Sequence, residues 1–321
     1  MRGDRNEGRF AWTSGDGRSR WSGERRRGRR AYACRLRRPW GRARHGAGLG
    51  RGGAGGGFTL VELLVCVAII GMLMAILTPT VGRAIELARR AKCAANLWGI
   101  GNALSLYGTE HGRYPVVPLN GAGWQVKIGE SRDVDPAGGA ERGRNPTSCL
   151  YELVRRNICQ TEMFICPSSS EDAKVLSGDF WDFADGSTIS YAVMNPYGTA
   201  HTFEMGVSVG VPLLADGSPY FDGRTGLRNE VPVADLAAAD ETEARAGNSV
   251  NHGRDGQNVS FAGGATWFRY RADVGVNLDN IYTRADAAAG TDPAGSIPSA
   301  GPNGMAADQG PAGPNDSFLV P

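Results

Sequence analysis

The sequence has few of the residues and spacings on which most enzyme active sites depend. It holds only four histidines among 321 residues, and none has a second histidine four residues away or the glutamate of a zinc hydrolase. There is no Walker A phosphate-binding loop and no serine of a nucleophile elbow. The glycine pattern at residues 50–55 formally matches a dinucleotide-binding fingerprint, but no strand precedes it. We therefore predict that the chain is not an enzyme.

Long uncharged runs are also rare, and the main one lies near the N-terminus. The 20 residues from Leu63 to Gly82 include no charged side chain, which is about the length of helix that crosses the hydrocarbon core of a bilayer. The run is longer than the apolar region of a secretory signal peptide, and Pro79 and Thr80 lie where its cleavage site would be expected. Residues 58–79 are therefore predicted to form a single transmembrane helix.

Charge is divided unevenly between the two sides of this helix. Residues 1–57 hold 16 arginines, no lysine and four acidic residues, a net charge of 16 − 4 = +12. The remainder holds 35 − 16 = 19 basic and 33 − 4 = 29 acidic residues, a net charge of −10. Because positive segments stay on the cytoplasmic side of a membrane, the basic leader should be cytoplasmic and the C-terminal domain periplasmic or surface-exposed. A basic arm can also bind nucleic acid, but its place before a membrane helix favours a leader, so no nucleic-acid partner is expected.

The residues that open the apolar run form a recognisable motif. Gly-Phe-Thr-Leu-Val-Glu at residues 57–62, followed at once by an apolar helix, resembles the processing site of type IV prepilins and type II secretion pseudopilins. In that family a membrane peptidase cuts after the glycine and methylates the new N-terminal residue, here Phe58. The resemblance implies that the leader, residues 1–57, is removed. It also assigns Glu62, with Pro79 at the end of the run, to subunit assembly, because an acid within the bilayer is costly and usually functional.

The helical pattern continues beyond the membrane segment. Apolar and small residues recur at helical spacing from Thr59 to about Tyr107, which predicts one helix with a kink at Pro79. Residues 80–115 would be its soluble half, and the glycines that follow Tyr107 would end it.

The rest of the exported chain has the pattern of short β-strands and loops. Residues 116–285 are predicted to form a small antiparallel β domain packed on the long helix, so the expected fold is α+β and pilin-like. The expected elements are a helix at 149–157 and strands at 163–166, 188–194, 207–214, 257–262 and 265–270. Gly263 and Gly264 predict a tight two-residue turn between the last two strands. Residues 286–321 are predicted to be a flexible Gly/Pro/Ala-rich tail whose residues 318–320 can dock back onto the domain.

Residues 248–283 form a second block with a family resemblance. They resemble the C-terminal region of prepilin-type proteins described by a histidine, nine residues and then Asp-Gly; here the histidine is His252. The chain departs from that pattern, because Gly263 and Gly264 replace Asp-Gly and the spacing is one residue longer. His252 and Asp255 are one candidate catalytic or metal pair. The interpretation that we favour is a turn in which His252, Gly263 and Gly264 are structural and the histidine bonds backbone carbonyls.

One loop offers oxygen ligands for a hard cation. Asp273, Asn277, Asp279 and Asn280 lie close together in the sequence and could bind calcium, although their spacing is not that of an EF-hand. Major pseudopilins of type II secretion hold calcium in a C-terminal loop, so the resemblance supports this expectation. The alternative is a solvated Asn/Asp turn. No other cofactor is expected.

Six cysteines are present, and four of them follow the membrane segment. In an oxidising compartment we expect one disulfide to join two of Cys149, Cys159 and Cys166, with Cys166 as the favoured member because Pro167 fixes it at the end of a predicted strand. The spacing of these cysteines, with no histidine nearby, does not predict a zinc site.

These features together favour a structural function. The resemblance implies a pseudopilin-type subunit of a type II secretion or type IV pilus-like system, held in the inner membrane by one span. The implied partners are a prepilin peptidase, other pseudopilin subunits in a homo- or hetero-filament, and a secretion or pilus assembly platform. The alternative is a non-assembling, membrane-tethered envelope domain that binds a ligand or a glycan.

Overall fold

The computed structural model describes residues 57–119, 123–130, 132–133, 135, 144–174, 180–197, 203–227, 229, 231, 239–284, 311 and 316–321. The predicted leader, apart from its last residue, and most of the predicted tail lie outside these residues. The described part has a long N-terminal helix packed against an antiparallel sheet. The predicted pilin-like α+β fold is therefore confirmed.

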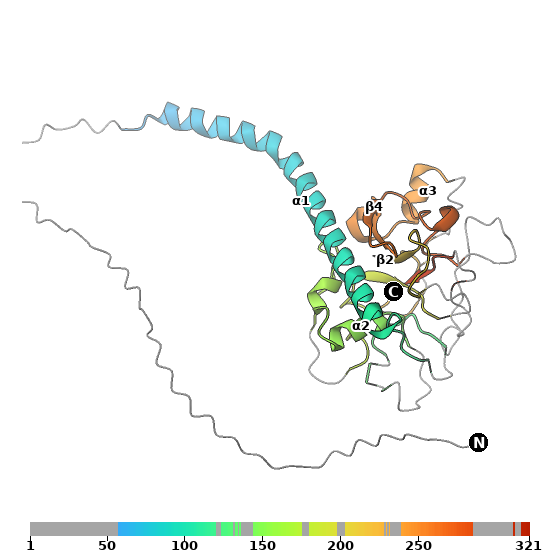
Figure 1. Ribbon diagram of the computed structural model, residues 1–321. Helices are drawn as coiled ribbons and strands as arrows, with labels where there is room; N and C mark the ends of the chain where they lie inside the picture. The colour runs from blue at the N-terminus through green and yellow to red at the C-terminus, as the bar shows by residue number, and fades with distance from the viewer. Residues whose placement is uncertain are drawn as a thin grey trace, which may run out of the picture. The chain divides into compact units, whose positions relative to one another are not determined.

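The long helix α1, Leu60–His111, runs unbroken for 52 residues. It begins directly after Thr59, where the sequence predicts its start. Pro79 lies inside the helix, and Figure 1 shows that α1 continues through this region with a bend. The helix ends at Gly112, which adopts the left-handed backbone with φ of 75°. The helix continues past Gly108. A Cβ atom at this position would lie 2.5 Å from the Met205 sulfur, so glycine lets the Met205 side chain pack closely against the helix.

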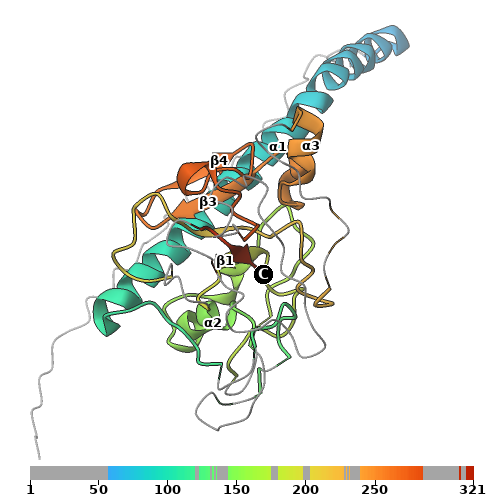
Figure 2. The same ribbon diagram turned by 90° about the vertical axis from the view of Figure 1, so that its right-hand side faces the viewer.

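The two parts of α1 have different surroundings. Among the described residues, α1 is the one helix long and apolar enough to cross a membrane. The most apolar 18-residue stretch of α1 has no buried residue. The later part is packed, and its buried side chains recur every three or four residues, at Cys93, Leu97, Ile100, Leu104 and Tyr107. This spacing places them on one face of the helix. That face contacts the sheet through β2, β3 and β4 (Figure 2).

Five strands form the sheet, and all neighbouring strands are antiparallel. They are β1 Tyr191–Met194, β2 Pro212–Asp216, β3 Gln257–Phe261, β4 Thr266–Arg269 and β5 Leu319–Val320, in the spatial order β4-β3-β2-β1-β5. The C-terminal residues therefore return to pair with β1, and the predicted docking of residues 318–320 is confirmed. The other helices in the described part of the chain are α2 Ser148–Arg155, α3 Glu241–Ala246 and the 3-10 helices η2 Thr161–Phe164, η3 Asn251–Arg254 and η4 Val276–Leu278.

Three predicted strands differ from the structure. Residues 163–166 are not a strand: η2 ends at Phe164, and the Cys166 amide donates to the Ser190 hydroxyl at 3.0 Å instead of to a neighbouring strand. The strand predicted at 188–194 begins only at Tyr191, because Thr188 closes a turn onto Asp185. The strand predicted at 207–214 is found at 212–216, as β2. The carbonyls of Val209 and Val211, just before β2, accept hydrogen bonds from the amides of Gly263 and Ala262 in the hairpin loop instead.

The β3–β4 hairpin has a three-residue loop in place of the predicted two-residue turn. Gly264 donates to the Phe261 carbonyl at 2.8 Å, and Phe261 donates to the Ala265 carbonyl at 2.9 Å. Of the two glycines, only Gly264 has a positive φ, of 81°. A Cβ atom at Gly263 would lie 3.0 Å from the Val209 Cβ, so Gly263 lets Val209 pack closely against the loop and does not supply a positive φ. This corrects the prediction of a two-residue turn formed by Gly263 and Gly264.

We expect Gly264→Val to destabilise the protein by about 1–2 kcal/mol, the usual cost of a left-handed residue with a Cβ atom. A Cβ atom at Gly264 would meet nothing within 4 Å, so the cost should come from the backbone alone. Gly264→Asn is the matched control, because asparagine tolerates this conformation. Urea unfolding of the purified chain measures both changes, and equal stability of the two variants would show that φ is not the constraint.

Candidate functional site

The start of α1 carries the residues of the predicted processing motif. Gly57 and Phe58 lie immediately before the helix, and both are exposed. Glu62 is also exposed, and its carboxylate accepts hydrogen bonds from the Thr59 amide at 2.9 Å and the Thr59 hydroxyl at 2.7 Å. Thr59 in turn accepts from the Glu62 amide at 3.2 Å. Glu62 therefore closes a capping box with Thr59. The Thr-x-x-Glu spacing of residues 59–62 is the sequence pattern of this cap, a role that was not predicted for Glu62.

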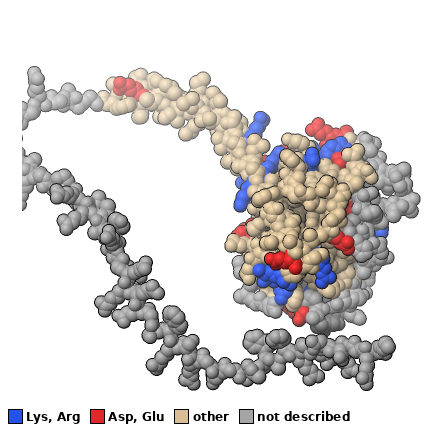
Figure 3. Space-filling view, in the orientation of Figure 1, with Lys and Arg blue, Asp and Glu red and all other residues tan. Residues whose placement is uncertain are grey.

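The surface that follows this motif is almost free of charge. Figure 3 shows an uncharged surface along the first part of α1, with acidic atoms only near its start. Leu60, Val61 and Leu63 are each more than half exposed in the isolated chain. An exposed apolar surface of this length needs a non-aqueous or protein environment to cover it.

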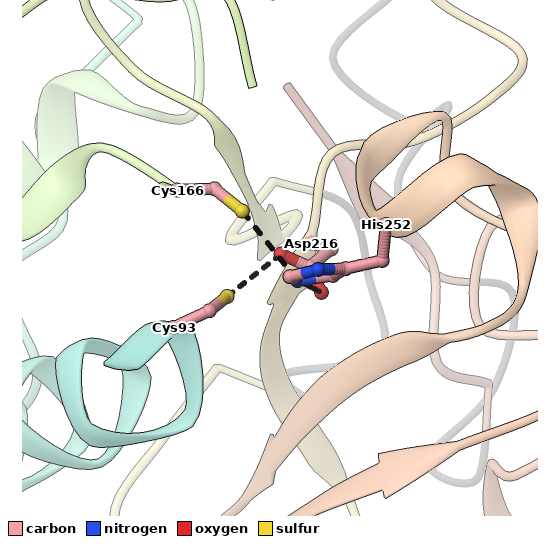
Figure 4. A group of neighbouring side chains, drawn as sticks. All are labelled: Cys93, Cys166, Asp216 and His252. Carbon is pink, nitrogen blue, oxygen red and sulfur yellow. Dashed lines mark hydrogen bonds and ion pairs between the residues drawn. The ribbon is translucent and has the colours of Figure 1, made fainter. Parts of the chain in front are cut away.

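A second group of side chains that could react or bind an ion lies where α1 meets the sheet. Cys93 comes from α1, Cys166 from the loop after η2, Asp216 from the end of β2 and His252 from η3. Figure 4 shows these four side chains pointing toward one another. One ligand atom from each lies within 4.8 Å of the others, and all four residues are buried. We refer to these four residues as the interface cluster.

Short contacts join the members of the interface cluster. The Cys93 thiol donates to the Asp216 Oδ1 at 3.0 Å. His252 Nε2 lies 3.5 Å from the Cys166 sulfur and 3.5 Å from the Asp216 Oδ2. The side chains of Asp216 and His252 have no exposed surface. The cluster is thus a closed polar site beside the apolar contact between α1 and the sheet.

A second layer of polar groups holds these side chains in place. His252 Nδ1 lies 2.6 Å from the Glu86 Oε1, and the Ser168 hydroxyl donates to the same carboxylate. The Asp216 Oδ2 accepts from the Asn258 amide at 2.7 Å. The Glu86 contact orients the imidazole so that Nε2 faces the Cys166 sulfur and the Asp216 carboxylate.

The close packing of these groups shifts their proton affinities. The neighbouring Cys93 side chain lowers the pKa of Cys166 to about 7, although burial opposes the shift. Burial, together with Cys166 and Asp216, raises the pKa of Cys93 well above its usual range. Burial alone would lower the pKa of His252, but the contacts with Cys166, Asp216 and Glu86 outweigh it and raise that pKa to about 9. Of the two thiols in the cluster, that of Cys166 therefore loses its proton more readily.

The structure corrects the predicted hydrogen-bond partners of His252. Its backbone lies in a turn, with φ of 56°, but its ring nitrogens face Glu86 and the interface cluster instead of backbone carbonyls. Asp255, the candidate partner, pairs with Arg90 at 2.7 Å and with Arg245. The sequence spacing did not predict a metal site because the four cluster residues are separated by 166 − 93 = 73, 216 − 166 = 50 and 252 − 216 = 36 positions.

The four predicted calcium ligands have separate surroundings. Asp273 pairs with Arg271 at 3.0 Å, and Asn277 is exposed. Asp279 accepts from the Ser317 amide at 2.8 Å, and Asn280 accepts from the Tyr282 amide at 3.1 Å. These contacts favour the alternative of a hydrogen-bonded Asn/Asp turn. Calcium binding here stays a prediction.

The disulfide predicted among Cys149, Cys159 and Cys166 is not formed in the structure, where all three are free thiols. Cys149 is buried on α2, and Cys159 lies in the turn that follows it. Cys166 instead faces Cys93 of α1, a cysteine that the sequence did not indicate as its neighbour. Spacing alone could not indicate this, because the tertiary fold brings α1 beside the loop after η2.

Comparison with known proteins supports the interpretation of the N-terminal segment. Residues 56–78 match the family described as the prokaryotic N-terminal methylation motif. No curated protein and no solved structure matches the chain significantly. The fold and this motif together define a pilin-like chain with a prepilin-type N-terminus, and the motif implies processing by a prepilin peptidase. The match does not extend to residues 248–283, whose resemblance stays a prediction.

We expect Cys149 and Cys159 to remain free in the folded protein. Burial raises the pKa of both thiols to about 11, so they should react slowly with iodoacetamide in the native chain and completely after unfolding without reductant. Mass spectrometry of the alkylated peptides measures this. A disulfide containing either residue would leave it unlabelled in the unfolded, unreduced chain and would contradict the structure.

Proposed function

We propose that this chain is a pseudopilin-type subunit that is cleaved after Gly57, methylated on Phe58 and assembled through α1 into a short filament. The observation that carries the proposal is the methylation motif at residues 56–78, which ends within the exposed apolar part of α1. The pilin-like fold supports it, because the rest of α1 carries a β domain.

The charge distribution supports one orientation in the inner membrane. The leader has a net charge of +12, and positive segments are retained in the cytoplasm. The β domain would then lie on the periplasmic side. The partners in this proposal are a prepilin peptidase, further subunits with similar apolar helices, and an assembly platform in the membrane. The interface cluster fits a structural subunit better than an enzyme, since its four side chains are buried where a substrate would not reach them.

We expect the mature protein to begin at Phe58 and to carry one methyl group on its new amine. Mass spectrometry of the N-terminal peptide, from protein extracted from membranes of a host with a prepilin peptidase, measures both changes. Gly57→Leu is the control that should block cleavage. An intact leader in the wild-type chain, or cleavage beyond Pro79, would contradict the proposed processing.

Glu62 has two candidate roles: it caps the helix with Thr59, and its charge can pair with the amine of Phe58. Substitutions that remove only the charge separate these roles. Glutamine at this position can still close the capping box with Thr59, but it has no charge to pair with the amine of Phe58 in the same or an adjacent subunit. We therefore expect Glu62→Gln and Glu62→Leu to be inserted and processed normally, yet to be depleted at least several-fold from filaments formed beside wild-type subunits.

Crosslinking through residues 84–95, followed by quantification of tagged wild-type and variant chains, measures incorporation. Glu62→Asp is the control that keeps the charge and should be incorporated better than Glu62→Gln. If Glu62→Gln enters filaments as well as wild type, the carboxylate serves only the helix cap. If wild-type chains form no crosslinked assemblies, a non-assembling, membrane-tethered domain becomes the better description.

A further inference from the structure

We propose that Cys93, Cys166, Asp216 and His252 form a structural zinc site that fixes the later part of α1 to the β domain. The four side chains supply two sulfur, one oxygen and one nitrogen donor, which are the ligand types that zinc takes in proteins. The inference rests on the geometry of the interface cluster and does not depend on filament assembly.

The spacing of the donor atoms matches a single small ion. A tetrahedral zinc ion lies about 2.3 Å from sulfur and about 2.0–2.1 Å from nitrogen or oxygen, which places neighbouring donors about 3.3–3.8 Å apart. In the cluster the Cys93 sulfur lies 3.0 Å from the Asp216 Oδ1, and His252 Nε2 lies 3.5 Å from the Cys166 sulfur and 3.5 Å from the other Asp216 oxygen, Oδ2. One donor atom from each residue lies within 4.8 Å of the other three. Small rotations of the side chains would therefore complete the coordination shell.

The outer contacts are those that a metal-bound histidine requires. A histidine that binds a metal through one nitrogen usually donates the other N–H to a carboxylate, which fixes the ring and its tautomer. Glu86 takes this position, 2.6 Å from His252 Nδ1. Glu86 is itself held by the Ser168 hydroxyl and lies 3.6 Å from the Arg90 Nε. The Asn258 amide orients the Asp216 carboxylate in a similar way.

Charge also favours an ion at this place. A carboxylate without exposed surface, beside two buried thiols, is costly unless a positive group compensates it. A protonated His252 is one such group. A zinc ion is another, because a divalent cation reduces the charge of two thiolates, one carboxylate and a neutral imidazole from three negative charges to one.

The position of the cluster indicates what the ion would do. Each ligand comes from a different segment, so the ion would tie α1 to the loop after η2, to β2 and to η3. Cys93 follows Leu60, the first residue of α1, by 93 − 60 = 33 residues. That separation is about 50 Å along an ideal helix and therefore extends beyond a hydrocarbon core of about 30 Å. Four protein ligands leave no open position, as in structural rather than catalytic zinc sites.

The test uses the full processed chain, purified in detergent with reductant present and exchanged into zinc-containing and then zinc-free buffer. Inductively coupled plasma mass spectrometry should find one zinc per chain in the wild type. Cys93→Ser, Cys166→Ser and His252→Gln should each lose most of the bound zinc. Cys149→Ser and Cys159→Ser, which change buried cysteines outside the cluster, are the matched controls and should keep one zinc per chain.

X-ray absorption at the zinc edge of the wild-type protein keeps the test independent of whether the variants fold. It should show two sulfur and two nitrogen or oxygen neighbours at the distances given above. A zinc spectrum without sulfur neighbours would overturn the proposal. Equal loss of zinc in the control variants and the cluster variants would also overturn it. So would a wild-type chain without zinc, whether Cys93 and Cys166 are then free or joined in a disulfide that intact-mass analysis detects.

Discussion

The apolar face along the later part of α1 is the contact on which the rest of the structure depends. Leu97, Ile100 and Leu104 have no exposed surface, and each buried side chain of this kind contributes about 1.5–3 kcal/mol relative to an exposed one. Five short strands of two to five residues each would form a weak sheet without a partner layer. The helix supplies that layer, so the β domain and α1 stabilise each other.

The same helix suits two environments because its sequence changes character along its length. The first part is apolar on all sides, which suits a surrounding without water. The later part keeps one apolar face and places charged residues such as Glu86 and Arg90 beside the domain. Glu86 then reaches His252, and Arg90 reaches Asp255 and lies over the ring of Phe268. Polar contacts therefore fix the register of α1 on the domain, in addition to apolar packing.

The interface cluster lies at this junction, where any unsatisfied polar group would be costly. Its members come from segments that are distant in the sequence and meet only when α1 docks on the sheet. A change in the contacts among these side chains would therefore affect the junction between the helix and the sheet. In the proposed filament, that junction would set the position of each β domain relative to the packed helices.

The long helix, its apolar first part, the motif at Gly57 and the β3–β4 hairpin could be predicted from the amino-acid sequence, because they depend on local pattern and on contiguous residues. The other features depend on contacts between distant segments. Residues 163–166 have the composition of a strand, yet Cys166 bonds Ser190 and turns toward α1. Only the docking of α1 on the sheet brings Cys93 to Cys166 and His252, because side chains separated by tens of residues meet through the fold and leave no spacing in the sequence that could be recognised in advance.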